Sequence, residues 1–318
     1  MRNRVGWLAA VLAVATAALV APSSNATYRA TNGLIAYQAW VGKHPHRQFQ
    51  IFTVQPDGTH VQQLTHFGDN LSQYFGGSGA EWPDWSPDGR KIIFTRHWGE
   101  YPEPQSFQLL TMNADGSAMR AVTSRGLDER ASYLPDGRIL YYRGSSHSWV
   151  VANPDGTHIR STAIHQRFAS LCVLSKGNRI ALKRSLNLKV PDTLSALFVG
   201  RLFGGPDRLK RITRYQRMDG IDCSPDGARI LFSSGHDFGV PKSANLFLVR
   251  TDGSGLVQLT RSQGGSVNNT AGSWSPDGTK IVFTRYRNRS KLYVMNADGT
   301  AVTQVTHGPE GAAWGSHR

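Results

Sequence analysis

The stretch "WSPDGRKIIFTR" at residues 85–96 decides the fold of this chain, because it recurs almost unchanged as "WSPDGTKIVFTR" at residues 274–285. Asp-Gly between two runs of alternating apolar residues is a strong signal for a tight β-hairpin turn, and the Pro before it fixes the first corner of that turn. Weaker copies occur at residues 133–143, 173–184 and 223–234. The stretch is therefore one hairpin of a repeated unit.

A second hairpin alternates with the first along the chain. Its Asp-Gly turns lie at Asp57, Asp115, Asp155, Asp252 and Asp298, with a degraded copy at Asp207. From Asp57 to Asp298 the mean step is about 48 residues. Two hairpins supply four strands per repeat, and four strands at this period are typical of the blades of a β-propeller.

The two ends of the repeat array complement each other. The segment "TNGLIAYQAW" (31–40) matches the second strand of a blade that lacks its first, and "EGAAWGSHR" (310–318) matches such a first strand. We therefore predict an all-β, six-bladed β-propeller of four-stranded blades, in which the C-terminal strand completes the first blade and closes the ring. The predicted blades cover residues 31–66 plus 310–316, 81–124, 129–166, 167–214, 218–261 and 270–307.

The repeat carries a family resemblance. The unit W-S-P-D-G-x-x-I-x-F-T-R, followed by L-Y-V-M-N-A-D-G-T, resembles the WD40-like (PD40-type) repeat of the TolB-like β-propeller family, over nearly the whole chain after the first 26 residues. The resemblance implies the propeller fold, an exported location and the binding of other molecules. TolB carries an α/β domain before its propeller, and we expect no such domain in this chain.

The first 26 residues differ from the rest. Arg2 and Arg4 precede an uncharged apolar run of 16 residues, and small residues occupy Ser24 and Ala26. This pattern predicts a signal peptide cleaved after Ala26, which would leave residues 27–318 as a single domain. The alternative is a retained membrane anchor, although 16 apolar residues are short for a bilayer span. We expect an exported protein, periplasmic, envelope-bound or extracellular, with no membrane span after cleavage.

The chain is strongly basic, with a formal net charge of +14. In an exported protein this charge favours an anionic polymer or a protein as the partner, and nucleic acid is not expected. We expect the propeller to be a monomer.

Short, similar turns are predicted at one end of the blades and longer, variable loops at the other, where binding normally occurs. At that end the second strands finish on equivalent arginines: Arg96, Arg143, Arg184 and Arg285. Such a partial ring could bind carboxylate, phosphate or sulfate groups through forked hydrogen bonds. The alternative is that each arginine only joins neighbouring blades.

Histidines and a tryptophan in the same loops are further ligand-binding candidates. They are His44, His46, His97, Trp98, His147 and His236. Clustered histidines can hold a metal, but a chain with 11 His places several in loops by chance, so no metal and no cofactor are predicted. The repeated aspartates are assigned to their turns, and Trp85, Trp274 and Trp314 to packing between blades.

The function predicted is a non-catalytic binding or scaffold propeller that recognises a protein or an anionic envelope ligand through its loop-rich face. No G-x-S-x-G nucleophile elbow occurs and no catalytic residue is assigned. Two alternatives are a carbohydrate lyase or hydrolase with its site at the funnel mouth, and a subunit whose partner docks across the loops.

Two cysteines, Cys172 and Cys223, fall in the first strands of neighbouring predicted blades. Aligned on the turn, they differ by one position, so they can face each other or point apart. Packed sheets lie about 10 Å apart, whereas a disulfide needs Cα atoms within about 7 Å. We therefore expect two buried free thiols, with a disulfide as the alternative.

Overall fold

The computed structural model describes residues 31–42, 47–68, 79–98, 106–162, 164–165, 170–174, 178–186, 194–203, 209–235, 243–262, 267–307 and 309–317. Within these ranges the regular elements are β-strands, apart from one short 3₁₀-helix, η1 (Gly144–Ser146). The predicted leader, residues 1–26, lies outside them. In the part that is described, no helix has the length and apolar character needed to cross a membrane.

Four separate four-stranded sheets follow one another along the described chain, each an antiparallel meander in sequence order. The first contains β8 (Glu129–Tyr133), β9 (Ile139–Arg143), β10 (Ser148–Ala152) and β11 (Arg160–Ser161). The second contains β12 (Ser170–Leu174), β13 (Arg179–Ser185), β14 (Ser195–Arg201) and β15 (Lys210–Arg211). The third contains β16 (Met218–Cys223), β17 (Arg229–Ser234), β18 (Asn245–Arg250) and β19 (Val257–Gln258). The fourth contains β20 (Asn268–Trp274), β21 (Lys280–Arg287), β22 (Arg289–Asn296) and β23 (Thr303–His307).

The remaining described strands form one eight-stranded sheet, in the order β24-β1-β2-β4-β5-β6-β7 with β3 beside β2. Its strands are β1 (Thr31–Val41), β2 (Gln48–Val54), β3 (Gln62–Gln63), β4 (Gly79–Trp85), β5 (Lys91–Trp98), β6 (Ser106–Asn113), β7 (Arg120–Ala121) and β24 (Pro309–His317). A single parallel pair, Phe49 with Gly79, joins β2 to β4. The C-terminal β24 pairs antiparallel with β1, from Thr31 opposite His317 to Ala39 opposite Pro309. The C-terminus therefore supplies an additional strand to the N-terminal sheet, as the sequence predicts.

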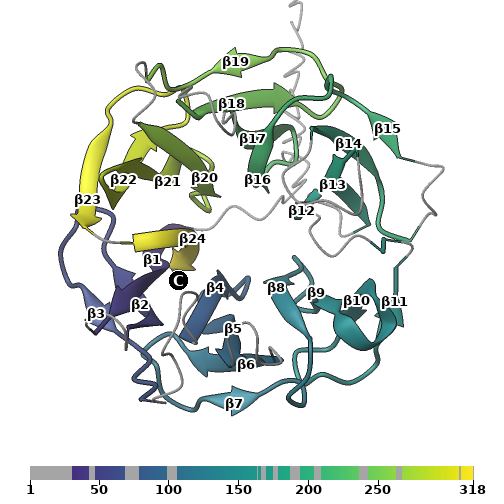
Figure 1. The fold of residues 1–318 in the computed structure, drawn as a ribbon, viewed down its shortest axis with the longest axis vertical. Coiled ribbons are helices and arrows are strands. Elements are labelled where there is room, and N and C mark those ends of the chain that lie inside the picture. The colour runs from purple at the N-terminus through teal and green to yellow at the C-terminus, as the bar shows by residue number, and fades with distance from the viewer. Residues whose placement is uncertain are drawn as a thin grey trace, which may run out of the picture.

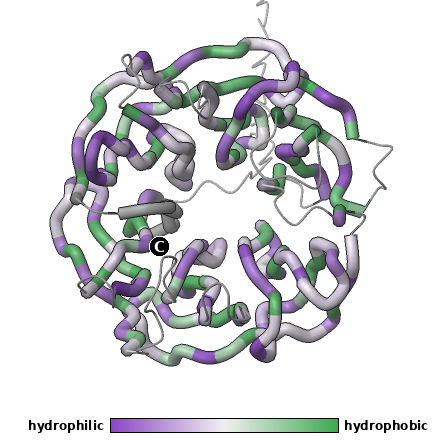
Figure 2. Tube along the Cα trace, viewed as in Figure 1, coloured by the Kyte–Doolittle hydropathy of each residue, from purple (hydrophilic) through white to green (hydrophobic). Residues whose placement is uncertain are grey.

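The sheets are arranged around one axis. Figure 1 shows β4, β8, β12, β16, β20 and β24 nearest the axis, and β7, β11, β15 and β19 at the periphery. Figure 2 shows apolar residues in every sheet, interspersed with polar ones along the strands. This is the all-β arrangement that the four-stranded repeat predicts.

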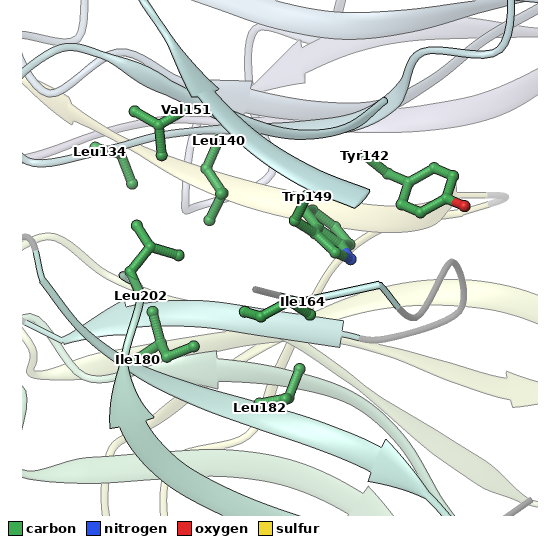
Figure 3. Packing of buried hydrophobic residues seen from close by; sticks show 9 residues of the cluster. All are labelled: Leu134, Leu140, Tyr142, Trp149, Val151, Ile164, Ile180, Leu182 and Leu202. Carbon is green, nitrogen blue, oxygen red and sulfur yellow. The ribbon is translucent and has the colours of Figure 1, made fainter. Parts of the chain in front are cut away.

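The hydrophobic core lies between neighbouring sheets rather than in one central mass. Figure 3 shows one such layer, in which Leu140 and Trp149 of one sheet face Ile180 and Leu182 of the next. Successive residues of a strand point to opposite faces, so each sheet contributes to two layers. Ile139, for example, packs on the layer before its sheet and Leu140 on the layer after it. Each sheet is therefore held by both of its neighbours.

The tight turns gather at one end of the molecule, which we name the turn end. Ala114 in the turn after β6 donates its N–H to the carbonyl of Arg90 in the turn after β4, at 2.9 Å. Ala297 and Thr279 make the same bond at 2.8 Å. At the opposite end, the loop end, the connection after β7 pairs with the start of β6 through the Gly126 and Phe107 backbones. This division into two ends is the one predicted from the sequence.

The repeated aspartates build their turns, as predicted. Each accepts the backbone N–H two residues later: Thr59 to Asp57 at 2.9 Å, Ser117 to Asp115 at 2.9 Å, Thr157 to Asp155 at 3.0 Å and Thr300 to Asp298 at 2.9 Å. The hydrogen bonds from the Thr59 side chain and backbone hold the pKa of Asp57 below its ordinary value. The sequence pattern Asp-Gly-Ser/Thr therefore reports local turn chemistry.

The expectation of two free thiols is wrong. Cys172 on β12 and Cys223 on β16 form a disulfide, with their Cα atoms 5.6 Å apart. The spacing of about 10 Å that argued against the bond applies to stacked sheets along their length. The inner strands of these two sheets converge toward the axis, and there the backbones come within disulfide range.

Candidate functional site

The first predicted binding residue, Arg96, lies at the end of β5 and is only 1% exposed. Phe94, two residues earlier, belongs to the apolar layer between the β1–β2 part and the β4–β5 part of the eight-stranded sheet, and side chains two residues apart share a face. The Arg96 guanidinium carbon lies 3.7 Å from the centroid of the Phe67 ring and 5.1 Å from that of Trp98. Arg96 therefore lies between these two parts of the sheet and does not project into the axis.

The other three arginines occupy the equivalent place in their own sheets. Arg143 donates from Nε to the Ser145 hydroxyl at 3.1 Å, and Arg285 donates from Nε to the Asn269 side-chain oxygen at 2.8 Å. Arg184 lies over the Phe198 ring at 5.8 Å. Each of these arginines shares a strand face with a residue of a different intersheet layer. That residue is Tyr141 for Arg143, Phe283 for Arg285 and Leu182 for Arg184. The four arginines are thus distributed around the axis and do not converge on one ligand.

Trp98 is the predicted residue that the structure brings into a cluster at the loop end. Its ring, partly exposed, has Arg96 on it at 5.1 Å and Arg125 on it at 4.8 Å. Arg125 is exposed and is oriented by a 2.9 Å hydrogen bond from its Nε to the Ser106 hydroxyl. We name Phe67, Arg96, Trp98 and Arg125 the aromatic–arginine stack. Cation–π contacts of this kind contribute about 0.5–2 kcal/mol each.

The predicted histidines are not brought together. His97 is buried, stacks on Phe107 with ring centroids 4.6 Å apart, and has its Nδ1 3.7 Å from Oε1 of Glu81. His147 is exposed and ends η1 in the left-handed conformation, with φ of 49°. His44, His46 and His236 fall outside the described residues. Among the residues that are described, no three His, Cys, Asp or Glu side chains are placed to share a metal ion.

A cavity of about 420 Å³ lies along the axis, lined by residues of the inner strands β4, β8, β12, β16 and β20. Two carboxylates line it, Asp84 and Asp222, which the sequence reasoning did not single out. Asp84 accepts the Tyr133 N–H at 2.7 Å, and Asp222 accepts the Trp274 N–H at 2.8 Å. Each carboxylate therefore connects its inner strand to the inner strand of the next sheet.

Burial in this cavity changes the acidity of both carboxyls. The pKa of Asp84 is raised to about 7, chiefly by desolvation and also by the charge of Asp222, against the opposing effect of the Tyr133 hydrogen bond. Desolvation likewise raises the pKa of Asp222 to about 6. The sequence contains a pattern that could have identified these two carboxylates. In "PDWSPDG" and "IDCSPDG", Asp84 and Asp222 come directly before the residue that packs between sheets.

A bulge interrupts β4, β8, β16 and β20 toward the loop end of this cavity, whereas β12 pairs with β13 without a register shift. In β4 and β8 it places Trp82 and Arg130 at positive φ, 52° and 59°. The Arg130 guanidinium lies over the Trp82 ring at 4.4 Å. The Trp82 N–H donates to the Gln38 side-chain oxygen at 2.7 Å, and the Arg130 N–H donates to the Thr95 hydroxyl at 3.1 Å. These bulges direct an aromatic and a cationic side chain to the cavity mouth.

Comparison with known proteins identifies this architecture. No protein-family model matches the chain. TolB from Acinetobacter baumannii superimposes with a TM-score of 0.67 at 16% identity, over 89% of this chain and 66% of TolB. The fold is that of a TolB-like β-propeller.

Two further solved structures resemble this propeller. The β-propeller domain of the trilobed protease from Pyrococcus furiosus has a TM-score of 0.52 at 13% identity, over 87% of this chain and 83% of that one. A chain of a nidogen/laminin complex has a TM-score of 0.63 at 9% identity, over 89% of this chain and 98% of that one. At these identities the likeness establishes the propeller fold and nothing finer.

Proposed function

We propose that the protein is an exported six-bladed propeller that works by binding rather than by catalysis, and that its partner is a protein or an anionic ligand of the cell envelope. Residues 1–26 act as a signal peptide in this proposal, and residues 27–318 form a single domain with the blade boundaries predicted above. N-terminal sequencing of the protein recovered from the envelope or the medium should start at Thr27. An intact Met1 would refute cleavage.

Contacts between the first and last repeats support a closed ring. Beyond the pairing of β24 with β1, the apolar layer that contains Ile35 and Val54 also contains Val282 and Val305. Gly58, in the turn after β2, lies directly against the Val305 carbonyl. The same relation between a turn glycine and the preceding sheet recurs at other sheets, which is what a continuous ring requires.

The aromatic–arginine stack is the observation that carries the binding proposal. It presents a partly exposed Trp98 beside an exposed Arg125 at the loop end, held in place from below by the buried Arg96. Trp and Arg are the residue types that most often dominate binding at protein interfaces. The nidogen/laminin structure provides a propeller-containing chain crystallised in a complex.

The test uses immobilised protein and an envelope extract at low and high salt. Wild type should retain a defined partner that high salt releases, because screening weakens contacts to a basic surface. Trp98→Ala with Arg125→Ala should lose that partner at least tenfold. The control is Arg90→Ala with Arg120→Ala, which removes two exposed arginines near the turn end. Equal loss in both double variants would refute the proposed surface.

A further inference from the structure

The hairpin of β21 and β22 is a tight strand connection at the loop end. Its strands stay paired up to the tip, with Arg287 opposite Arg289 and only Asn288 between them. Asn288 has a φ of 66°, a conformation that Asn tolerates better than most residues and that tight hairpin turns require. The hairpin is therefore a regular two-stranded ribbon rather than an irregular loop.

Four cations lie on one face of this ribbon. Arg285 is opposite Lys291 and Arg287 is opposite Arg289. Residues two apart on a strand share a face, so these two pairs form two successive rows, which strand geometry separates by about 6.6 Å. Like charges directly opposite each other destabilise a sheet. The arrangement therefore carries an electrostatic penalty that an anion on this face would remove.

The polar partners of these cations within the described chain are neutral. Arg285 donates to the Asn269 side-chain oxygen at 2.8 Å, and Lys291 donates to the Gln304 side-chain oxygen at 3.3 Å. The guanidiniums of Arg287 and Arg289 are exposed and make no hydrogen bond to any residue that the structure describes. Their forked donors are available to a ligand.

The same face forms one wall of a pocket of about 480 Å³. The opposite wall comes from the neighbouring sheet, from residues 259–262 just after β19, and adds Arg261 as a fifth cation. The hydroxyls there are engaged: Thr260 donates to the Asn245 side chain, and Ser262 accepts from Asn269. No Asp or Glu is among the described residues that line the pocket. Its chemistry is that of an anion site.

We propose that this pocket binds two successive anionic groups of an extended polyanion, one group at each row of the ribbon. Guanidinium forks form paired hydrogen bonds with phosphate, sulfate or carboxylate oxygens, and Arg287 and Arg289 supply them at the outer row. Arg285 and Lys291, with Arg261 across the pocket, face the inner row. The site goes beyond the function proposed above, because it shares no residue with the aromatic–arginine stack and either site can fail alone.

The experiment measures binding of fluorescently labelled long-chain polyphosphate to the purified full chain at about 0.15 M salt. Wild type should bind, and Arg287→Ala with Arg289→Ala should bind about 10- to 100-fold more weakly. The matched control, Arg90→Ala with Arg120→Ala, removes the same charge near the turn end and should stay within about twofold. Arg287→Lys with Arg289→Lys keeps the charge but not the forks, and should give an intermediate loss.

Competition with unlabelled anions defines the ligand. Dextran sulfate and polygalacturonate, which present repeated sulfate or carboxylate groups, should compete to degrees that rank the anionic group, whereas neutral dextran should not compete. Inorganic phosphate that competes as well as polyphosphate at equal phosphate concentration would overturn the two-row site. So would a wild type that does not bind, or a control variant as weak as Arg287→Ala with Arg289→Ala. Trp98→Ala with Arg125→Ala should bind polyphosphate like wild type, which keeps the two proposals separable.

Discussion

Cys172 and Cys223 are covalently joined at the position where other inner strands use a carboxylate. Asp84 reaches the backbone N–H of Tyr133 in the next sheet, and Asp222 reaches that of Trp274. When the repeats are aligned on their turns, Cys172 occupies the position of the two aspartates, and Cys223 that of Tyr133 and Trp274. The disulfide and the two carboxylates are therefore three instances of the same connection between neighbouring sheets, made in two chemical forms.

The disulfide should contribute substantially to stability, because it links residues 51 apart in sequence and constrains the unfolded chain. Reduction should lower the free energy of unfolding by about 2–4 kcal/mol. Urea unfolding with and without reductant measures the difference. Cys172→Ala with Cys223→Ala should match the reduced wild type and should not respond to reductant. If the oxidised and reduced proteins unfold at one urea concentration, this prediction is wrong.

Asp84 should make the protein less stable as pH rises. A carboxyl whose pKa is raised in the folded state holds its proton more tightly when folded, so its contribution favours folding near pH 4 and is lost as pH rises through about 7. Asp84→Asn keeps an acceptor for the Tyr133 N–H without the charge. We expect this variant to exceed wild type at pH 8 by on the order of 1–2 kcal/mol, a discounted figure because Asp84 is partly exposed.

The control for that experiment is Asp136→Asn, which should change stability in the opposite direction. Hydrogen bonds and the charge of Arg138 lower the pKa of the turn residue Asp136, against its partial burial. Stability from Asp136 is therefore present above its unfolded pKa and lost as pH falls, so Asp136→Asn should weaken the protein at pH 8 rather than strengthen it. Unfolding midpoints of both variants from pH 4 to 8 provide the comparison. A stabilised Asp136→Asn would show that the response is unrelated to the axial cavity.

Gly156 should be required for packing between sheets as well as for its turn. Its φ is +85°, and a Cβ there would collide with the Val122 carbonyl of the preceding sheet. Gly137 has the same φ of +85°, but no atom lies within 4 Å of the position that a Cβ would take there. Gly137→Ala should therefore cost only the left-handed backbone penalty, about 1 kcal/mol, and Gly156→Ala at least about 2 kcal/mol more. The difference in thermal stability between Gly156→Ala and Gly137→Ala measures the contribution of the intersheet contact. Equal losses of stability in the two variants would contradict this prediction.

Substitution of Arg96 should lower the free energy of unfolding, whereas substitution of Arg287 should leave it nearly unchanged. Arg96→Ala removes a side chain that is 1% exposed and packed on Phe67, and should lower the free energy of unfolding by about 2–4 kcal/mol. Arg287→Ala, at an exposed position, should change it by less than about 0.5 kcal/mol. Urea midpoints of the two single variants decide the point. If Arg96→Ala is as stable as wild type, Arg96 does not stabilise the fold and is a candidate for ligand binding alone.

The hairpins and the added C-terminal strand could be predicted from the sequence because their signals are local. Asp88 and Asp277 in their Pro-Asp-Gly turns specify the chain reversal by themselves, and the match of residues 310–316 to a missing first strand needed only the repeat. Contacts across sheets carry no such signal. Whether Cys172 meets Cys223 depends on how closely two inner strands approach, which is a tertiary quantity.

The arginines also show that contacts across sheets cannot be predicted from local sequence signals. Aligning the repeats placed Arg96 and Arg285 at equivalent positions, and the structure confirms that equivalence through Phe94 and Phe283 two residues earlier. The alignment does not say that this face packs against the preceding sheet rather than toward the axis. The pairing of Arg287 with Arg289 was equally hidden, because only the register of a tight hairpin puts them opposite each other.

The pairing of β1 with β24 also fixes how the molecule can be attached to anything else. Thr31 lies opposite His317, and Asn32 donates to the Asp277 carboxylate at 2.9 Å, which places both ends of the described chain at the turn end. A tether or support joined through either terminus would therefore hold the propeller by its turn end. Trp98, Arg125 and the basic ribbon would then face outward, away from the point of attachment.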